Sequence, residues 1–320
     1  MTELRAGVDL GGTKVQVVVI DAEGAVLGEA RHDTPTTGGP EAVTDTIALG
    51  VEEATTGAGS ETAELTGIGL GSPGAVDPAA GTVTQPPNLH DWDDAYPLGP
   101  QLQERLGAPV AMGNDVSVAT QAEFELGAGK PYDSLLGVFW GTGVGGGLIL
   151  GGKPWIGRGA AGEIGHMVVK LGGRRCGCGR LGCLEAYAGR ASMERKARKL
   201  VERGQHTDLF TIMEKRGRTR LTSGVWDRAL KHGDHLAQRL IDQAVEALGA
   251  GIASAINLLD VEAVLIGGGL GTRLGEPYVE CIREAMMPHV FVDDRPPDVL
   301  LASLGDLGGA VGAALLARRA

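Results

Sequence analysis

The sequence has few cysteines, no uninterrupted hydrophobic segment of membrane-span length and no excess of positive charge. Its four cysteines include three between positions 176 and 183, which is poor spacing for a disulfide framework. The longest uncharged run, residues 134–152, contains several glycines and is therefore expected to form a hairpin with a loop. The formal net charge of −11 opposes binding to nucleic acid or to anionic membranes, so we expect small-molecule chemistry without either partner.

The first residues contain no apolar run typical of a signal segment, and the sequence contains no low-complexity linker. It reaches Arg5 and Asp9 without an apolar segment, so we expect no secretory signal and a cytoplasmic protein. A chain of 320 residues that is 43% hydrophobic has the length for two cores. We expect a small lobe of residues 1–119 plus 303–320 and a large lobe of residues 120–302. The basic run 195–231 is interpreted as a solvated helical face, with nucleic-acid binding as the alternative.

Glycine is abundant instead, at 53 residues, and it is concentrated in short motifs that follow apolar strands. Residues 6–9 and 15–20 predict one hairpin, and residues 135–140 and 148–150 predict a second with a similar glycine tip. The similarity suggests a duplicated phosphate-binding lobe. Further predicted elements are helices at 41–53, 116–126 and 234–258, strands at 65–70, 110–112 and 261–266, and a last helix opened by residues 305–310.

The first glycine turn combines a carboxylate, open backbone N–H groups, a hydroxyl and an ammonium, which is the donor set that phosphate and hydrated Mg²⁺ require. Its residues are Asp9, Gly11, Gly12, Thr13 and Lys14. A P-loop is disfavoured because a strand, beginning at Val15, follows the lysine. The alternative is an ordinary glycine hairpin.

The second turn matches the dinucleotide fingerprint G-x-G-x-x-G literally at residues 141–146. A Rossmann dehydrogenase is nevertheless disfavoured, because residues 148–150 continue as a strand and not as a helix. Together with the turn at 267–269, the two hairpins are expected to enclose a nucleotide from both sides of a cleft. The expected nucleotide-binding residues in this half are Thr142, Gly143, Gly268 and Gly269.

A metal site is predicted from one imidazole and three thiolates close together in sequence. The residues are His166, Cys176, Cys178 and Cys183. They form a closed tetrahedral set for structural Zn²⁺, with reduced cysteines in a glycine-rich loop as the alternative. Such a metal would hold Glu163 and Glu185 near one site, where carboxylates suit vicinal sugar hydroxyls; solvated surface charges are the alternative. Cys281 is expected to be buried filler.

Five segments together resemble the ROK family (repressors, open reading frames, kinases), and within it most closely the bacterial ATP-dependent glucokinases. They are residues 9–14, Pro87-Asn88-Leu89 before Trp92, Asn114-Asp115, residues 162–167 and the cysteine block 176–185. The order and spacing of these segments extend the resemblance over nearly the whole chain.

The resemblance implies an α/β, actin-like ATPase (ribonuclease H-like) fold of two lobes with a nucleotide and sugar cleft between them, and a homodimer or homotetramer. It implies ATP, Mg²⁺ and structural Zn²⁺ as cofactors. Asp115 resembles the general base that accepts the proton of the sugar 6-hydroxyl. The implied sugar ligands are Asn88, Asn114, Asp115, Glu163, His166 and Glu185.

Departures from the family pattern leave the choice of hexose open. Residues 116–120 read Val-Ser-Val-Ala-Thr where the family's kinases often have Ala-Asn-Ala-Ala-Ala, and Ala75 replaces a bulkier residue. Glucose is expected first, and mannose, fructose, N-acetylglucosamine and N-acetylmannosamine are the alternatives.

Three further classes of protein are compatible with the resemblance to different degrees. A sugar-responsive repressor would need a winged helix ahead of Asp9, which lies too near the N-terminus. A non-catalytic sugar sensor would keep the fold but would not need the donor set of residues 9–14 together with Asp115. A kinase that uses polyphosphate would keep the fold and change the phosphoryl donor, although family members of that kind usually lack the cysteine block. ATP is therefore the expected donor.

Overall fold

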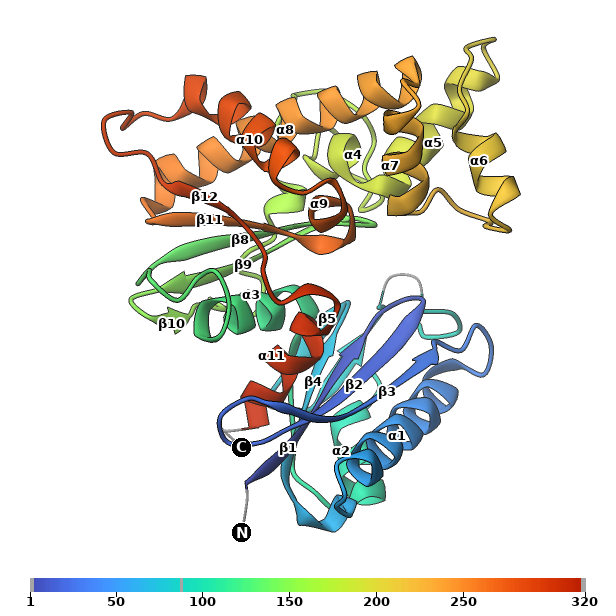
Figure 1. The fold of residues 1–320 in the computed structure, drawn as a ribbon, viewed down its shortest axis with the longest axis vertical. Coiled ribbons are helices and arrows are strands. Elements are labelled where there is room, and N and C mark those ends of the chain that lie inside the picture. Colours follow the sequence, from blue (N-terminus) through green and yellow to red (C-terminus); the bar gives the residue numbers. More distant parts are fainter. Residues whose placement is uncertain (1–2, 87–88, 318–320) are drawn as a thin grey trace. The chain divides into compact units, whose positions relative to one another are not determined.

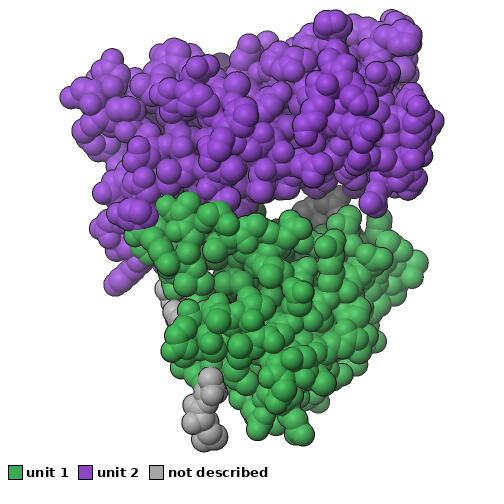
Figure 2. All heavy atoms as spheres, viewed as in Figure 1, with its two compact units in different colours: residues 1–130, 156–159, 303–320 green, residues 131–155, 160–302 purple. Residues whose placement is uncertain are grey.

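The computed structural model describes residues 3–86 and 89–317 of the chain. The chain divides into two compact units, coloured separately in Figure 2. Unit 1 comprises residues 1–130, 156–159 and 303–320, and unit 2 comprises residues 131–155 and 160–302. Each unit contains one five-stranded sheet with helices packed on it, so each is described by itself below.

The sheet of unit 1 has the strand order β3-β2-β1-β4-β7. Its strands are β1 (Leu4–Leu10), β2 (Lys14–Ile20), β3 (Val26–Asp33), β4 (Leu65–Ser72) and β7 (Val110–Asn114). The first three strands are antiparallel, whereas β1, β4 and β7 run parallel. The short strands β5 (Ala75–Asp77) and β6 (Thr82–Thr84) pair separately. The first predicted hairpin is therefore confirmed as β1 and β2.

Helices cover both faces of this sheet. They are α1 (Gly39–Gly57), α2 (Leu98–Leu106), α3 (Asp115–Glu125) and α11 (Gly308–Leu316). Val15, Val17 and Val19 of β2 belong to the core that includes α1 and α2, whereas Val18 and Ile20 pack with α11. Successive side chains of a strand point to opposite faces, so a strand covered on both faces is apolar throughout. Helix α3 packs against α11 on the second face (Figure 1).

Two glycines in the central strands let α11 approach the sheet closely. A Cβ at Gly7 would lie 2.0 Å from the Ala310 carbonyl oxygen, and one at Gly69 would lie 1.6 Å from the Ala313 oxygen. Neither distance leaves room for a side chain. The C-terminal helix is thus an integral layer of a unit that begins at the other end of the chain.

The sheet of unit 2 repeats the same plan, with the order β10-β9-β8-β11-β12. Its strands are β8 (Leu135–Trp140), β9 (Val144–Leu150), β10 (Lys153–Pro154), β11 (Ala263–Gly267) and β12 (Asp298–Leu301). Three antiparallel strands are again followed by two parallel ones. The duplication expected from the two glycine-tipped hairpins is present in the sheet topology, although β9 already begins at Val144.

The helices of unit 2 surround a core in which α8 is the longest element. They are α4 (Glu185–Ala188), α5 (Arg190–Val201), α6 (Leu209–Lys215), α7 (Ser223–Lys231), α8 (His235–Leu259), α9 (Gly268–Leu274) and α10 (Glu276–Met286). Helix α8 buries an apolar stripe that includes Leu240, Leu248 and Ile252. Its N-cap is Asp234, whose side chain accepts the N–H groups of the first turn.

Two sequence expectations differ from the structure. The expected boundary at residue 119 falls inside α3, which continues to Glu125 and packs on α11, so residues 120–130 belong with unit 1. The interpretation of Cys281 as buried was wrong, because its side chain is exposed on α10. That helix buries Val279, Ile282 and Met286, and position 281 lies off this stripe.

None of the helices within residues 3–86 and 89–317 combines the length and the hydrophobicity that crossing a membrane would need.

Candidate active site and metal centre

The parallel strands of unit 1 bring two predicted site residues, Asp9 and Asp115, to one edge of the sheet. Asp9 of β1 pairs with Gly71 of β4, and Gly71 pairs with Gly113 of β7. Asp115 follows as the first residue of α3, and a Cβ added at Gly71 would lie 3.4 Å from the Asp115 Cα. Sheets of this kind bind ligands at the carboxyl ends of their parallel strands. The two carboxylates therefore belong to the edge where chemistry is expected.

Asp9 lies at the end of β1, where protein surrounds its carboxylate. Burial raises the pKa of Asp9, and the charge of Lys14 at the start of β2 opposes this rise. Gly309 of α11 lies close to the carboxylate, since a Cβ there would be 2.8 Å from Asp9 Cγ. A carboxylate whose charge is only partly compensated in this way gains from an additional cation. Asp9 is thus chemically suited to lie beside a metal–phosphate complex.

The first glycine turn is held to the end of β3. The Gly11 N–H donates to the Lys14 carbonyl at 2.9 Å, and the hydroxyl of Thr34 donates to the Gly11 carbonyl at 2.6 Å. The Thr34 N–H donates to the carbonyl of Thr13, whose side chain is exposed. Gly12 is half-buried between them. The turn is therefore fixed by hydrogen bonds to its backbone, one of them from the Thr34 side chain.

Asn114 and Asp115 lie at the junction between β7 and α3. The Asn114 Oδ1 accepts the N–H groups of Val116 and Ser117 at 3.1 and 3.2 Å, so Asn114 is the N-cap of α3. The Asp115 Oδ1 accepts the Val116 N–H at 2.9 Å. Both side chains are half-buried and held by the helix start. A sugar contact by Asn114 would thus use its amide NH₂ group.

In unit 2, the second and third glycine turns leave the sheet at a common edge. Phe139 of β8 pairs with Gly267 of β11 in a parallel ladder, and the chain turns directly after both strands. A Cβ at Gly141 would lie 3.8 Å from the Gly269 nitrogen. Gly268 has a φ of +79°, and a Cβ there would lie 2.7 Å from the Trp140 backbone. The segments containing Thr142 and Gly143 and containing Gly268 and Gly269 are therefore neighbours.

Arg190, which the sequence analysis did not single out, is hydrogen-bonded to the second glycine turn. Its Nη2 donates to Thr142 Oγ1 and its Nη1 donates to Ser223 Oγ, both at 2.8 Å. The backbone N–H groups of Arg190 and Ala191 donate to the Gly141 and Thr142 carbonyls at 3.1 and 3.0 Å. In the sequence Arg190 was indistinguishable from the basic run that follows it, because its partners are distant along the chain.

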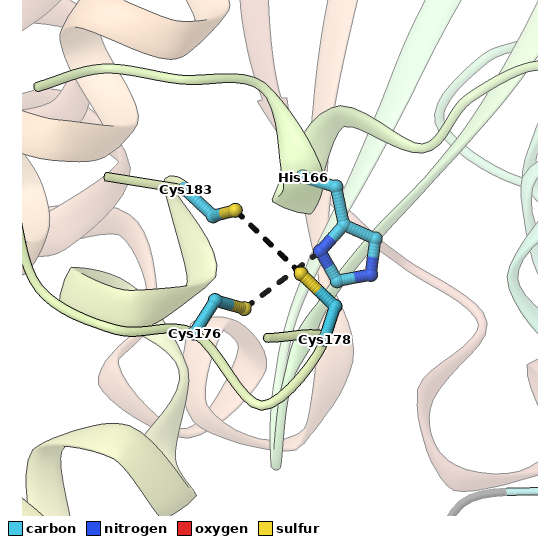
Figure 3. A group of neighbouring side chains, drawn as sticks. All are labelled: His166, Cys176, Cys178 and Cys183. Carbon is cyan, nitrogen blue, oxygen red and sulfur yellow. Dashed lines mark hydrogen bonds between the residues drawn. The ribbon is translucent and has the colours of Figure 1, made fainter. Parts of the chain in front are cut away.

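The four predicted metal ligands come together in unit 2 (Figure 3). Their donor atoms, in His166, Cys176, Cys178 and Cys183, all lie within 4.8 Å of one another. Two bridges, Val168 with Cys183 and Arg175 with Leu181, fold the intervening chain into a hairpin that brings the thiols to the imidazole.

The spacing of the donor atoms fits tetrahedral zinc. The Cys178 and Cys183 sulfurs are 3.8 Å apart, and the Cys176 sulfur is 3.8 Å from His166 Nδ1. Thiolates about 2.3 Å from a tetrahedral Zn²⁺ would be separated by about 3.8 Å. The donor set therefore fits a closed zinc site in which His166 binds through Nδ1.

The thiols differ in their environments. Burial raises the pKa of the Cys176 thiol to about 12, whereas a hydrogen bond from the Arg180 backbone N–H lowers that of Cys178 to about 7. Burial also raises the pKa of Cys183. Coordination deprotonates a thiol, and a divalent metal would compensate the negative charges of the resulting thiolates.

The two predicted glutamates lie at different positions relative to the metal ligands. Glu185 Oε2 accepts the Val144 N–H at 3.1 Å, and Oε1 lies 3.6 Å from the Cys176 sulfur. Glu185 therefore joins the metal loop to the second glycine turn. Glu163 Oε2 is 3.9 Å from His166 Nε2, the nitrogen that Nδ1 ligation would leave for another partner. Asn88 lies outside the described residues.

The class of protein follows from the same sheet topology in both units and from the glycine turns at the strand ends of each sheet. The fold is that of the actin-like ATPases, shared with two solved structures over nearly the full chain. One is the ROK hexokinase from Thermus thermophilus, with 35% identity, a TM-score of 0.81, and coverage of 99% of this chain and 98% of that chain. The other is a ROK family glucokinase from Streptomyces griseus in complex with glucose and AMPPNP, with 33% identity, a TM-score of 0.83, and coverage of 99% and 100%.

The sequence comparison gives the family. The chain matches the ROK family over residues 5–320, and it therefore belongs to that family. It is 34% identical over 319 residues to the glucokinase of Streptomyces coelicolor, covering 98% of each chain. The resemblance inferred from the sequence motifs is thereby confirmed.

Proposed function

We propose that the protein transfers the terminal phosphoryl group of ATP to the 6-hydroxyl of a hexose, with glucose as the first substrate. The observation that carries the proposal is that Asp9 and Asp115 lie at the same carboxyl edge of the unit 1 sheet. It occurs in a member of the ROK family whose relatives include a glucokinase solved with glucose and AMPPNP. Mannose, fructose, N-acetylglucosamine and N-acetylmannosamine are the alternative substrates.

Asp115 is the proposed general base. Phosphoryl transfer requires mainly an oriented hydroxyl, a proton acceptor and neutralised phosphate charge. The hydrogen bond from the Val116 N–H orients the Asp115 carboxylate at the start of α3. The proposed sugar ligands are Asn88, Asn114, Glu163, His166 and Glu185. The amide of Asn114 would donate, because its oxygen already caps the helix.

The glycine turns and Asp9 are proposed to hold the nucleotide. Gly11, Gly12, Thr13 and Lys14 would contact phosphate in unit 1, and Thr142, Gly143, Gly268 and Gly269 would do so in unit 2. Mg²⁺, when bound, would neutralise charge on the phosphates. The raised pKa of Asp9 supports a place beside that cation, since burial leaves its charge only partly compensated.

Zinc is proposed as a scaffold for sugar binding. Because three thiolates and one imidazole close its coordination sphere, a Zn²⁺ ion would supply rigidity to the loop that carries His166 and precedes Glu185. Glu185 transmits that rigidity to the second glycine turn through its hydrogen bond with Val144.

The decisive experiment is a coupled assay of ADP release across glucose, mannose, fructose, N-acetylglucosamine and N-acetylmannosamine, with ATP and polyphosphate compared as donors. Asp115→Asn should lower turnover by about 10²-fold or more while sugar binding stays measurable. Asp45→Asn, on the exposed surface of α1, is the matched control and should retain activity. Absence of sugar-dependent ADP release would overturn the proposal in favour of a sugar sensor.

We also propose that the chain forms a homodimer or a homotetramer. Leu258 and Phe291 in unit 2 are 83% and 87% exposed, and Asn257 bonds to the backbone of the segment containing Phe291. Burial of such side chains against a second copy would remove apolar area from water. Light scattering of the unchanged protein and of Phe291→Glu tests this, and a monomer in both samples would contradict it.

A further inference from the structure

Arg190 brings a positive charge to the second glycine turn of unit 2. Its guanidinium bridges Thr142 Oγ1 and Ser223 Oγ, each at 2.8 Å, so it lies between that turn and the start of α7. The backbone of Arg190 is fixed to the same turn through the Gly141 carbonyl. These hydrogen bonds hold both the backbone and the guanidinium of Arg190 against the turn.

Among the residues that the structure describes, no carboxylate bonds to the Arg190 guanidinium. Within the described part of the chain, its guanidinium hydrogen bonds join hydroxyl groups only. The nearby carboxylate of Glu194 instead accepts bonds from Arg198 at 2.6 Å and from the Leu221 N–H at 2.9 Å. Burial lowers the pKa of Arg190, the charge of Glu194 opposes that change and the charge of Arg220 adds to it. A guanidinium remains charged at neutral pH, so this half-buried cation favours an anion beside it.

The glycine backbone of the third turn lies beside the residues that Arg190 joins. Gly269 lies beside Ser223, since a Cβ on Gly269 would be 3.5 Å from Ser223 Oγ, and beside Gly141, whose own added Cβ would be 3.8 Å from the Gly269 nitrogen. A cation, two hydroxyls and open glycine backbone thus converge within unit 2. Guanidinium groups bind phosphate oxygens with paired, charge-assisted hydrogen bonds.

We propose that Arg190 is a phosphate-binding residue that contacts the di- or triphosphate of the nucleotide through the edge of its guanidinium next to Thr142. The inference rests on the proposed function, because it assumes that a nucleotide occupies the second turn. If Arg190 only stabilised the turn, it would make the same two hydrogen bonds to hydroxyl groups. The two roles differ in one measurable respect, which is the dependence of affinity on the phosphates of the ligand.

Direct binding of ADP and of adenosine, measured by calorimetry, separates the two roles. Arg190→Gln keeps a donor for Thr142 or Ser223 and removes the charge. It should reduce the ratio of the adenosine Kd to the ADP Kd by about tenfold or more, with adenosine affinity nearly unchanged. Arg190→Lys should retain most of the ratio. Arg195→Gln is the matched control, since Arg195 bonds to a hydroxyl, Ser192 Oγ, on the same helix; its ratio should stay unchanged.

An unchanged ratio in Arg190→Gln, or an equal loss of affinity for both ligands, would overturn the inference. If that variant fails to fold, phenylglyoxal modification of the unchanged protein gives the answer: ADP should protect Arg190 and adenosine should not. Equal modification with and without ADP would also overturn it. Absence of ADP binding by the unchanged protein would overturn the proposed function as well, whereas ADP binding with an unchanged ratio overturns this inference alone.

Discussion

A Cβ placed on Gly309 would lie 2.8 Å from both Cγ and Oδ2 of Asp9. The first turn of α11 and the end of β1 therefore meet at a contact that only glycine permits, although the two residues come from opposite ends of the chain. Ordinary Cβ contacts are longer, so any side chain at position 309 must displace the carboxylate or the helix. The position of the proposed nucleotide-binding carboxylate thus depends on the C-terminal helix.

Gly309→Ala should lower phosphoryl transfer by about 10²-fold, because a shift of about 1 Å in a positioning group costs that much. The added methyl group should also reduce the free energy of unfolding by about 1–3 kcal/mol. Turnover and denaturant unfolding measure the two effects. Gly57→Ala, at the end of α1, is the control, since its Cβ would meet only Gly28 Cα at 3.9 Å. Full activity in Gly309→Ala would show that the Asp9 position is not critical.

Local patterns were sufficient to predict the central strands of both sheets, the long helix α8 and the metal cluster. The hairpin of β1 and β2 follows from two apolar runs around a glycine turn, and α8 follows from its 3.6-residue repeat. The metal donors were predictable because three of them lie between positions 176 and 183, where the chain has little freedom to separate them. The hairpin, the helix and the metal donors were predictable because each depends on residues close together in the sequence.

Contacts between distant segments were not predictable in this way. Nothing local indicates that Gly309 meets Asp9 or that Arg190 joins Thr142 to Ser223, because tertiary packing creates both contacts. Cys281 shows a different failure. Its residue type suggested burial, but the pattern of α10 places it off the stripe of buried residues. Periodicity was the better guide there than composition.

The purified protein should contain one zinc ion per chain, and Cys178→Ser should lose it. Cys178 is exposed, so the substitution removes a ligand without leaving a cavity in the core. The three remaining donors would bind zinc more weakly, and thermal stability should fall because metal binding contributes to folding. Elemental analysis and thermal unfolding measure both effects. Cys281→Ser, also exposed and remote in sequence, should keep the metal. Zinc-free unchanged protein would rule out the assignment.

Glu185→Gln should raise the KM for the hexose by about tenfold while the zinc content stays unchanged. One carboxylate oxygen accepts the Val144 N–H at 3.1 Å, and the other faces the metal loop, so the neutral amide would lose a charge-assisted contact and weaken this connection. Calorimetric titration with glucose in the absence of ATP checks the binding effect. Glu202→Gln, exposed just after α5, serves as the control. Loss of zinc together with sugar binding would instead indicate a role in the metal loop alone.

Asp234 should make the stability of unit 2 sensitive to acid. Burial raises the pKa of Asp234, but hydrogen bonds from Ala237, Thr207, Asp208 and Leu236 outweigh it, so the net pKa lies below the ordinary value. Those contacts measure 2.6–2.9 Å; the two from Leu236 and Ala237 cap α8, and the two from Thr207 and Asp208 tie the segment before α6 to it.

A lowered pKa means that the stabilisation is fully present above the unfolded value of 3.8 and is lost as the pH falls through the folded value. Asp234→Ala should therefore cost about 2 kcal/mol at neutral pH, the upper range for an N-cap. The difference from the unchanged protein should shrink as the pH falls below 3.8. Urea unfolding at several pH values measures it. Asp242→Ala, which removes only an exposed contact with Gln238 on the same helix, should show a small effect. A cost for Asp234→Ala that is constant with pH would mean that the cap acts through packing and not through its charge.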